Sequence, residues 1–363
     1  MHLIYLFRPK NPMLYHCSES FYKAMIANTD FNVTNYSVNH LYSVTFQETW
    51  LLIKKLVSVN GEEKISVFFF LIQLDYLVLA LILKTITKTF NKNLKIYYLM
   101  HEPKFEKGRI SPFKAYMIFL YHLIFGHIGD KIFLPSDEAL LKAKDFINND
   151  KLYKVNLSFI SPPENILQKN LAQLKFSWSQ EKTFSLIGRG DRDKNPQGFL
   201  CLSSIINKYY PEQARFIRGG FDRNVQVNYD EKLIIRFPGF ISNSAKSFLL
   251  GLSHFVVIPY SFSTQSGVVT EALSYGKLLI INDIPTFSYL KGLSFVFLID
   301  FNDEKAILEC IDDVMNMDIN DYKERYWEAI AYFKKNHSEA YLSNLLSDII
   351  NIDSVKNSVK IDF

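Results

Sequence analysis

The sequence predicts an α/β protein of two domains, each with a parallel sheet that helices cover on both faces. Short apolar runs alternate with longer amphipathic segments along the chain, which is typical of parallel strands joined by helices. The alternation is broken at Pro162 and Pro163, a pair that neither a helix nor a central strand accommodates. A length of 363 residues is enough for two hydrophobic cores.

The first half alternates strongly between the two kinds of segment. Strands are expected at 3–7, 33–37, 65–71, 95–100 and 131–134, and helices at 18–27, 45–58, 75–87, 112–125 and 137–148. Ser136 precedes two acids, which is typical of a helix N-terminus. The apolar stretch 65–83 is long enough to suggest a membrane span. Because Gln73 and Asp75 interrupt it, we interpret it as a buried strand followed by a helix.

The segment 115–125 is too short to span a membrane. It is expected to form a core helix. Its aromatic residues leave a second interpretation open, in which they rest in a membrane interface. These residues are Tyr116, Phe119, Tyr121 and Phe125.

A polar stretch, 168–182, follows the break at the two prolines, where we place the domain boundary, and the second half then repeats the alternation. Strands are expected at 183–187, 214–219, 232–237, 255–259, 278–282 and 294–299. Helices are expected at 196–208, 242–250, 267–275 and 303–315, followed by one long amphipathic helical region at 321–350. Ser242 or Asn243 is expected to cap the second of these helices.

Charge and cysteine content narrow the class of protein. Residues 1–160 contain 19 Lys and Arg against 13 Asp and Glu, a net +6, while the whole chain carries +4. A basic first half suits anionic lipid headgroups or phosphorylated ligands, although a solvated basic surface explains it equally. No dense basic stripe with interleaved aromatics favours nucleic acid. Three distant cysteines and an N-terminus without signal-peptide features fit a cytoplasmic protein.

The segment 259–277 contains a candidate phosphate site. An apolar run leads into small hydroxylated residues, and a helix is expected to begin at Gly267 with Ser266 and Val268 beside it. Exposed amides at a helix N-terminus, together with the helix dipole, attract a phosphate. Glu271 lies one turn further, where a carboxylate can accept hydrogen bonds from a ribose. An ordinary β-α-β crossover explains the same pattern.

A second candidate follows the strand 183–187. Gly188 permits a close approach of backbone or ligand. Arg189 and Lys194 lie five residues apart across a turn and can point to one volume above the sheet edge, where two cations suit a diphosphate. Asp191 and Asp193 leave open a surface loop whose charges neutralise one another.

Taken together, three segments resemble a known family. The order Gly-Arg-x4-Lys, Phe-x-Gly-Phe-Ile and Ser-Gly-Val-x2-Glu-Ala-Leu-x-Tyr-Gly-Lys resembles the C-terminal domain of GT-B glycosyltransferases, above all the group 1 or GT4-like set of bacterial polysaccharide biosynthesis. The resemblance is specific over 183–300 and looser over 96–160. It implies two Rossmann-like domains that face an interdomain cleft: an acceptor domain at 1–162 and a nucleotide-sugar domain at 163–335. A final helix, 336–363, would cross back to the first domain.

The resemblance also implies roles for single residues. Arg189 and Lys194 would hold the diphosphate, with amides of Ser266, Gly267 and Val268. Glu271 would bind the ribose, and Phe240 and Ile241 would lie at the base. The family often places a glutamate toward the donor sugar where this chain has Ser263, so Ser263 or Gln265 would bind the sugar as a neutral group.

In the first half, His101 follows a strand, at a place where similar enzymes often carry a histidine that faces the donor sugar and the acceptor. His101 would hydrogen-bond the sugar or the attacking hydroxyl. Glu102 would be the base if the reaction inverted the anomeric centre.

These features predict a glycosyltransferase that moves a sugar from a nucleotide-diphospho-sugar to a glycan or a lipid-linked glycan. We expect retention of the anomeric configuration, and we expect no metal and no further cofactor. We expect a cytoplasmic protein with peripheral contact at the inner face of the plasma membrane. Two alternatives stay open: a non-hydrolysing nucleotide-sugar 2-epimerase, for which His101, Glu102 and Glu271 are a small set of cleft groups, and a catalytically silent GT-B subunit, which Ser263 makes conceivable.

Overall fold

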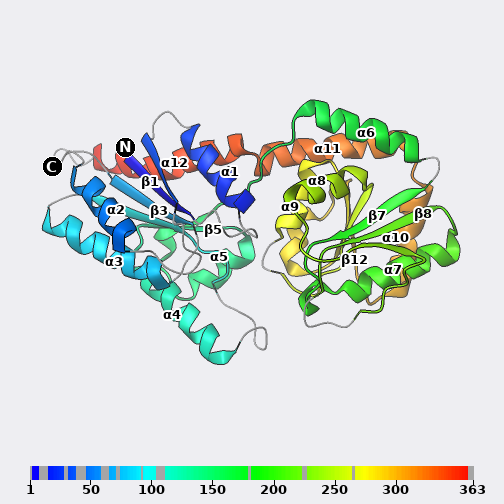
Figure 1. Ribbon diagram of the computed structural model, residues 1–363, viewed down its shortest axis with the longest axis horizontal. Coiled ribbons are helices and arrows are strands. Elements are labelled where there is room, and N and C mark those ends of the chain that lie inside the picture. Colours follow the sequence, from blue (N-terminus) through cyan, green and yellow to red (C-terminus); the bar gives the residue numbers. More distant parts are fainter. Residues whose placement is uncertain are drawn as a thin grey trace. The chain divides into compact units, whose positions relative to one another are not determined.

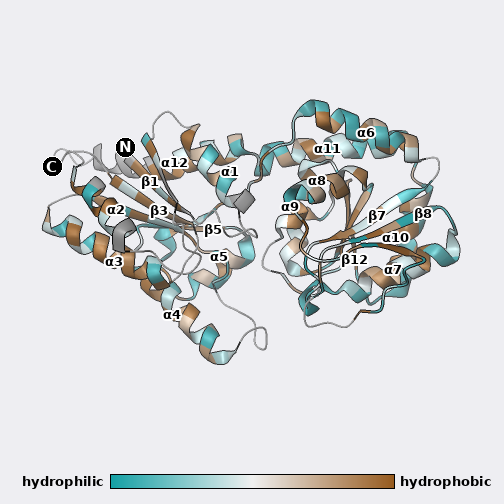
Figure 2. Ribbon diagram, in the orientation of Figure 1, coloured by the Kyte–Doolittle hydropathy of each residue, from teal (hydrophilic) through white to brown (hydrophobic). Residues whose placement is uncertain are grey.

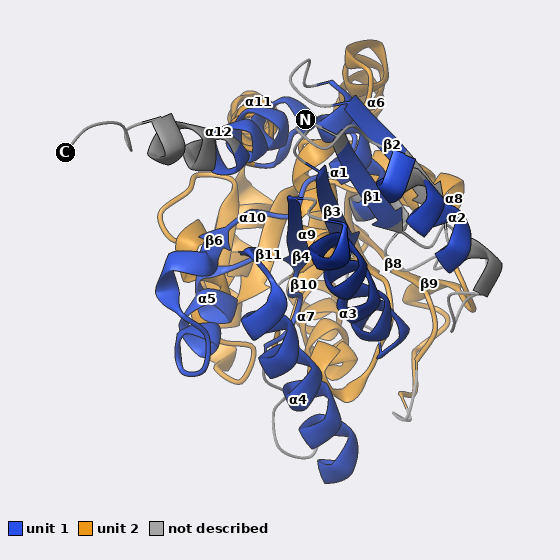
Figure 3. Cartoon of the chain, turned by 90° about the vertical axis from the view of Figure 1, so that its left-hand side faces the viewer, with its two compact units in different colours: residues 1–160, 337–363 blue, residues 161–336 orange. Residues whose placement is uncertain are grey.

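The structure is a computed structural model of the chain. It describes residues 2–7, 15–27, 32–37, 46–58, 65–70, 74–90, 93–103, 111–178, 181–222, 227–263 and 266–358. Its internal contacts divide the chain into two units, which Figure 3 shows in different colours. Unit 1 comprises residues 1–160 and 337–363, and unit 2 comprises residues 161–336. The predicted divisions fall after residues 162 and 335.

The described part of unit 1 contains a parallel sheet of six strands in the order β2-β1-β3-β4-β5-β6 (Figure 1). The strands are β1 (His2–Phe7), β2 (Asn32–Ser37), β3 (Ile65–Phe70), β4 (Leu94–Leu99), β5 (Lys131–Leu134) and β6 (Leu152–Lys154). Figure 2 shows β1 and β3 as hydrophobic strands, and β3 is buried along its whole length, as a strand covered on both faces must be. The edge strand β6 was not predicted, because three half-exposed residues carry no pattern.

The helices of unit 1 are α1 (Tyr15–Ile26), α2 (Phe46–Ser58), α3 (Leu74–Thr89), α4 (Pro112–Ile128), α5 (Asp137–Lys144) and α12 (Glu339–Ser358). Figure 1 shows α1 and α12 side by side on one face of the sheet, and α2, α3 and α4 follow one another on the other face. Ser136 caps α5 as predicted, because its hydroxyl accepts a hydrogen bond from Ala139 N at 3.1 Å. The helix ends at Lys144 and not at 148; a 3₁₀ turn follows at Asn149–Lys151.

The interpretation of residues 65–83 as a strand and a helix is confirmed by β3 and α3. None of the described helices has both the length and the apolar character that crossing a bilayer requires.

Unit 2 contains, among its described residues, a second parallel sheet of six strands in the order β12-β11-β10-β7-β8-β9. The strands are β7 (Lys182–Ile187), β8 (Ala214–Gly219), β9 (Ile234–Phe237), β10 (Phe255–Ile258), β11 (Leu278–Asn282) and β12 (Val296–Ile299). The helices are α6 (Glu164–Trp178), α7 (Pro196–Tyr209), α8 (Asn243–Leu252), α9 (Gly267–Ser274), α10 (Glu304–Asn316) and α11 (Ile319–His337). The strands β7 and β10 lie at the centre of this sheet and are buried.

No helix was predicted in the polar stretch 168–182, yet most of this stretch belongs to α6. Leu167, Leu171 and Leu174 lie one helical turn apart and are buried, so α6 has the apolar stripe of a packed helix despite its polar composition. The Tyr326 hydroxyl of α11 donates a hydrogen bond to Leu167 O at 2.8 Å and holds the first turn of α6 in place.

The helical region expected at 321–350 consists of two helices, α11 and α12, which meet at Ser338, close to residue 336, where a separate final helix was expected to begin. His337 lies at this junction and is buried, with Nδ1 2.8 Å from Leu157 O. Burial lowers the pKa of His337 to about 4, so the ring is neutral at physiological pH. Phe159 N donates to His337 O at 3.2 Å, and these two contacts join the end of α11 to unit 1.

Candidate functional site

The predicted phosphate-binding residues follow two neighbouring strands of the unit 2 sheet. The segment 188–195 follows β7 and the segment 259–263 follows β10, and these strands pair in parallel. Because parallel strands end at one edge of a sheet, both segments lie at the carboxyl edge, where open α/β sheets bind ligands. Ser261 N donates to Asp193 O at 3.0 Å and joins the two segments directly.

Two glycines allow the turns after β7 and β8 to pack backbone against backbone. Gly188 has a φ of 114° and Gly220 a φ of 123°, a region that favours glycine. A Cβ on Gly220 would lie 2.0 Å from Gly188 O, so no larger residue fits there without a shift. A Cβ on Gly188 would lie 3.7 Å from Val268 Cγ2, which places Gly188 beside the first turn of α9.

Arg218, which was not among the predicted site residues, forms hydrogen bonds with the backbone at the carboxyl edge of the sheet. It lies in β8, and its side chain is 1% exposed. Its guanidinium donates to Gly188 O at 2.9 Å, to the Tyr229 hydroxyl at 3.1 Å and to Asp222 Oδ1 at 2.8 Å. A charge buried this deeply requires such partners. The sequence carried little signal for this role, because β8 contains two arginines, Arg215 and Arg218, and only the fold distinguishes them.

The two predicted diphosphate ligands each have an acidic neighbour. Arg189 Nη2 lies 3.1 Å from Asp191 Oδ2, and Lys194 Nζ lies 3.6 Å from Asp193 Oδ2. The sequence left this pairing open, and the structure shows that it forms. All four side chains are partly exposed, so a ligand that carries more negative charge than a carboxylate can compete for the two cations.

Tyr260, which follows β10, fixes the position of the Lys194 ammonium. Lys194 Nζ lies 3.8 Å from the centre of the Tyr260 ring, within the range of a cation–π interaction. Burial raises the pKa of the Tyr260 hydroxyl to about 12, so the group stays protonated. The loop after β10 therefore positions a cation that the loop after β7 supplies.

The helix α9 begins as predicted at Gly267, with Ser266 as its cap. The Ser266 hydroxyl accepts a hydrogen bond from Val269 N at 3.4 Å. The first turn, 267–270, contains no acid, so its partial positive charge is not neutralised from within. Gly267 and Val268 are half-buried.

The two predicted sugar ligands differ in what the structure shows. Ser263 is buried, and its carbonyl accepts a hydrogen bond from the Thr286 hydroxyl. Gln265 lies outside the described residues. The structure therefore gives neither residue a contact with a donor sugar, and these roles stay predictions.

Glu271, the predicted ribose ligand, is buried in α9 and paired with a residue that the sequence did not indicate. Its Oε2 lies 2.7 Å from Lys246 Nζ, which belongs to α8. The lysine neutralises the carboxylate and fixes its orientation, so an accepting carboxylate oxygen is held near the sheet edge. Only the fold brings residues 246 and 271 together.

The predicted base-binding residues stand between β9 and α8. Gly239 has a φ of 92°, and α8 begins after Ser242, whose hydroxyl accepts from Ala245 N at 3.2 Å as predicted. Phe240 is exposed, and Ile241 is half-buried with its Cδ1 2.8 Å from the Cβ position built on Gly219. Ile241 therefore lies next to the carboxyl end of β8.

His101 and Glu102 belong to unit 1 and follow β4 by two and three residues. Both are half-buried. Their backbone is anchored by His122 of α4, which is buried and hydrogen-bonded to the backbone of Glu102. Burial lowers the pKa of His122 to about 4, so the anchoring ring is neutral. The structure thus places His101 at the carboxyl edge of the unit 1 sheet, and its role toward a ligand stays a prediction.

Two Rossmann-like units, each with a parallel six-stranded sheet, define the fold of this chain as GT-B. Solved structures share this fold along nearly the whole chain. The Anabaena protein Alr3699/HepE, solved in complex with UDP and glucose, aligns with a TM-score of 0.63 at 10% identity, over 97% of this chain and 100% of that one. Sucrose-phosphate synthase from Thermosynechococcus elongatus aligns with a TM-score of 0.64 at 11% identity, over 98% and 100%.

A third similar structure, from E. coli, is a trehalose-6-phosphate protein with bound UDP-2-fluoro glucose, at a TM-score of 0.64 and 12% identity over 96% of this chain and 99% of that one. No model of a known protein family matches the chain, and no curated protein does either. At these identities the similarity establishes the fold.

Proposed function

We propose that this protein is a glycosyltransferase that takes its sugar from a nucleotide-diphospho-sugar bound to unit 2. The observation that carries the proposal is the meeting of the Gly188–Lys194 loop and the N-terminus of α9 at one edge of the sheet. Two cations and a set of helix amides there suit a diphosphate. Similar folds solved with UDP and with UDP-2-fluoro glucose support the same ligand class.

The chemistry would follow from stabilising the leaving group. As the bond from the sugar to the diphosphate breaks, negative charge grows on the diphosphate, and Arg189, Lys194 and the amides at Gly267 stabilise it. Before the nucleotide binds, Asp191 and Asp193 hold the two cations. The diphosphate then replaces these carboxylates as their partner, and no metal ion is needed.

The rest of the donor would be held by neighbouring elements. Glu271 accepts hydrogen bonds from the ribose hydroxyls, and its pairing with Lys246 fixes it for that task. Phe240 and Ile241 contact the base, and Ser263 or Gln265 the sugar. The reaction retains the anomeric configuration, as glycosyltransfer does in a trehalose-6-phosphate synthase of similar fold.

The acceptor would be a glycan or a lipid-linked glycan of bacterial surface polysaccharide, bound by unit 1. Its net charge of +6 over residues 1–160 suits a lipid diphosphate. His101, at the carboxyl edge of β4, hydrogen-bonds the attacking hydroxyl or the donor sugar.

A thermal-shift screen against UDP, GDP, CMP and their sugars tests the nucleotide site. A ligand at 100 times its Kd adds about 2.7 kcal/mol to the free energy of unfolding and raises the Tm. Arg189→Ala and Lys194→Ala are expected to remove most of that shift. Asp191→Asn removes a competing carboxylate and is expected to tighten binding.

Arg192→Ala is the matched control, because Arg192 is an exposed cation in the same loop without an assigned role. If nucleotide raises the Tm of Arg189→Ala and Lys194→Ala as much as that of the wild type, the proposed diphosphate site is wrong. A nucleotide that binds without any turnover of its sugar would identify a binding subunit, and a changed sugar nucleotide without acceptor would identify an epimerase.

A further inference from the structure

The helix α4 has an unusual composition for the surface of a folded unit. Among its 17 residues, the titratable ones are Lys114, His122 and His127, apart from two tyrosines, and none is an acid. The remaining residues are almost all apolar and stand on every side of the helix. A helix that is apolar all round normally lies inside a core or within a membrane.

This helix is not inside the core. Its fully buried residues, His122, Phe125 and Gly126, all belong to the second half. In the first half, Phe113 is 76% exposed and Tyr116 is 62% exposed. The core interpretation therefore holds for Phe125, whereas Tyr116 presents its ring to the surroundings.

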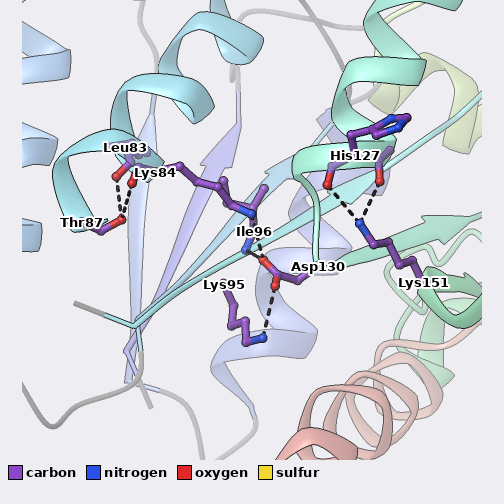
Figure 4. A network of polar contacts seen from close by, with 9 residues as sticks. Leu83, Lys84, Thr87, Lys95, Ile96, His127, Asp130 and Lys151 are labelled. Carbon is purple, nitrogen blue, oxygen red and sulfur yellow. Dashed lines mark hydrogen bonds and ion pairs between the residues drawn. The ribbon is translucent and has the colours of Figure 1, made fainter. Parts of the chain in front are cut away.

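The second half of α4 is firmly attached to unit 1, as Figure 4 shows in part. Lys151 Nζ donates to Gly126 O at 3.1 Å and to His127 O at 3.0 Å, so the last carbonyls of the helix are satisfied. Asp130 accepts from Ile96 N at 2.8 Å and forms an ion pair with Lys95 at 3.2 Å, which ties the end of the helix to β4. These contacts fix the second half of α4, from which the exposed first half extends.

The neighbouring helices add apolar side chains to the same layer. In α3, Leu74, Val78 and Leu81 follow one another at helical spacing and are all exposed. Figure 2 shows hydrophobic residues, in brown, along the ribbons of α3 and α4. In α2, Trp50 and Leu51 are exposed as well. We call this set of exposed side chains on α2, α3 and α4 the α2–α4 face.

Charge decides between possible partners of the α2–α4 face. The three helices contain five lysines, against the two acids Glu48 and Asp75. The lysines are Lys54, Lys55, Lys84, Lys88 and Lys114, of which Lys84 forms an ion pair with Asp130 at 3.9 Å. Two copies of such a face would repel each other, whereas anionic lipid headgroups complement it. Lys54 Nζ lies 5.6 Å from the centre of the Trp50 ring, so a cation and an amphipathic ring stand side by side.

We propose that the α2–α4 face docks on a lipid surface with anionic headgroups, and that the first half of α4 enters the boundary between headgroups and acyl chains. Aromatic rings and long basic side chains are suited to that boundary, because each joins an apolar body to a polar end. The docking does not depend on the nucleotide site, so the two proposals can fail separately.

Vesicle sedimentation tests the proposal with the full chain. Wild-type protein is expected to sediment with vesicles of phosphatidylcholine and phosphatidylglycerol, and less with phosphatidylcholine alone or at high salt. Phe113→Ser together with Tyr116→Ser is expected to lower the partition coefficient at least about tenfold, because two large apolar side chains no longer enter the lipid. Phe176→Ser is the matched control, since Phe176 of α6 is also 76% exposed.

Trp50 reports the contact directly. Its emission is expected to shift to the blue on addition of anionic vesicles, and a Trp50→Phe variant should still bind but lose the shift. No binding to anionic vesicles, or equal binding by the double variant and the wild type, would overturn the proposal. A dimer in solution that the double variant dissociates would overturn it as well, by showing that a second copy covers this face.

Discussion

At the scale of single residues, Arg218 determines the geometry of the loop after β7. Arg218→Met keeps the apolar stem but leaves Asp222 as a half-buried charge without its ion-pair partner and removes the guanidinium hydrogen bonds to four backbone carbonyls. Breaking a buried ion pair in this way costs about 3–5 kcal/mol of the free energy of unfolding. We expect a clear fall in Tm, together with weaker nucleotide binding.

Arg236→Met serves as the control for that substitution. Arg236 stacks on Tyr229, the same ring that Arg218 contacts, with 4.7 Å between its guanidinium carbon and the ring centre, but Arg236 is exposed. Its loss should cost no more than about 1 kcal/mol. Equal falls in Tm for the two variants would show that Arg218 is not a support of the loop.

The burial of Lys277 predicts how the free energy of unfolding depends on pH. Its Nζ is fully buried and has no hydrogen-bond partner among the described residues; the Tyr326 ring centre lies 5.7 Å away. Burial lowers the pKa of Lys277 from 10.5 to about 7. Between these values the unfolded chain binds a proton that the folded chain does not, so stability rises with pH across this window. Below about pH 7 the cost of burying the charge is present in full.

Lys277→Met removes this dependence. The variant should be more stable than the wild type below about pH 7, and the advantage should shrink toward pH 10.5. Lys277 also lowers the pKa of His254, but that pKa is about 3 and lies outside this window, while Lys182, whose pKa burial lowers to about 8, is present in both proteins. Denaturant unfolding of both proteins between pH 7 and pH 10.5 measures the difference in their free energies of unfolding. A difference that does not change with pH would contradict the lowered pKa of Lys277.

The sequence predicted the site unevenly. Residues in one short motif, such as Gly188 to Lys194 or Ser266 to Glu271, could be placed because local spacing decides their geometry. The partner of Glu271 could not be predicted, because Lys246 reaches it only through the packing of α8 beside α9. The role of Arg218 was hidden for the same reason: its acceptors lie in a neighbouring strand and in the turns at the sheet edge.

At the scale of elements, the start of α9 offers a test that separates folding from binding. Ser266→Asp keeps a side-chain acceptor for Val269 N, and a carboxylate at a helix N-terminus stabilises it by about 0.3–1 kcal/mol. The same carboxylate would repel a diphosphate. We expect a Tm equal to or above that of the wild type and a loss of the UDP-dependent shift.

Ser266→Asn is the neutral counterpart, because asparagine caps a helix as well as aspartate does. It should bind UDP far better than the aspartate variant. If both variants keep the full shift in Tm, no phosphate lies at this helix.

The sequence predicted the bounds of a strand or helix where the hydrophobic pattern and the length of the segment indicated the same kind of element. The strands β5, β8 and β11 have the predicted bounds, because each is an apolar or mixed run closed by a turn residue. The helix α6 was missed because its three buried leucines stand in a polar sequence. No proline or glycine marks the break between α11 and α12, so only the family resemblance indicated a separate final helix from residue 336; the contacts of His337 with residues 157–159 decide the break.

At the scale of the whole molecule, the last helix belongs to a different unit from the one that precedes it. The described part of α12 packs against α1, and Lys131 Nζ donates to Ile349 O, so a segment at the end of the chain completes unit 1. The nucleotide site, in contrast, is made of unit 2 residues. A change in α12 should therefore weaken unit 1 and spare the site.

Leu346→Ala tests this division, because Leu346 is fully buried in α12. A buried leucine replaced by alanine costs about 2–5 kcal/mol. Hydrogen exchange should accelerate at the amides of β1 and β3 in unit 1, while β7 and β10 keep their wild-type rates and UDP still protects the start of α9. The control is Ile330→Ala in α11, a buried residue of unit 2, which should accelerate exchange in β7 and β10 instead. If Leu346→Ala accelerated exchange equally in both sheets, α12 would stabilise the chain as a whole and the assignment of residues 337–363 to unit 1 would have no energetic meaning.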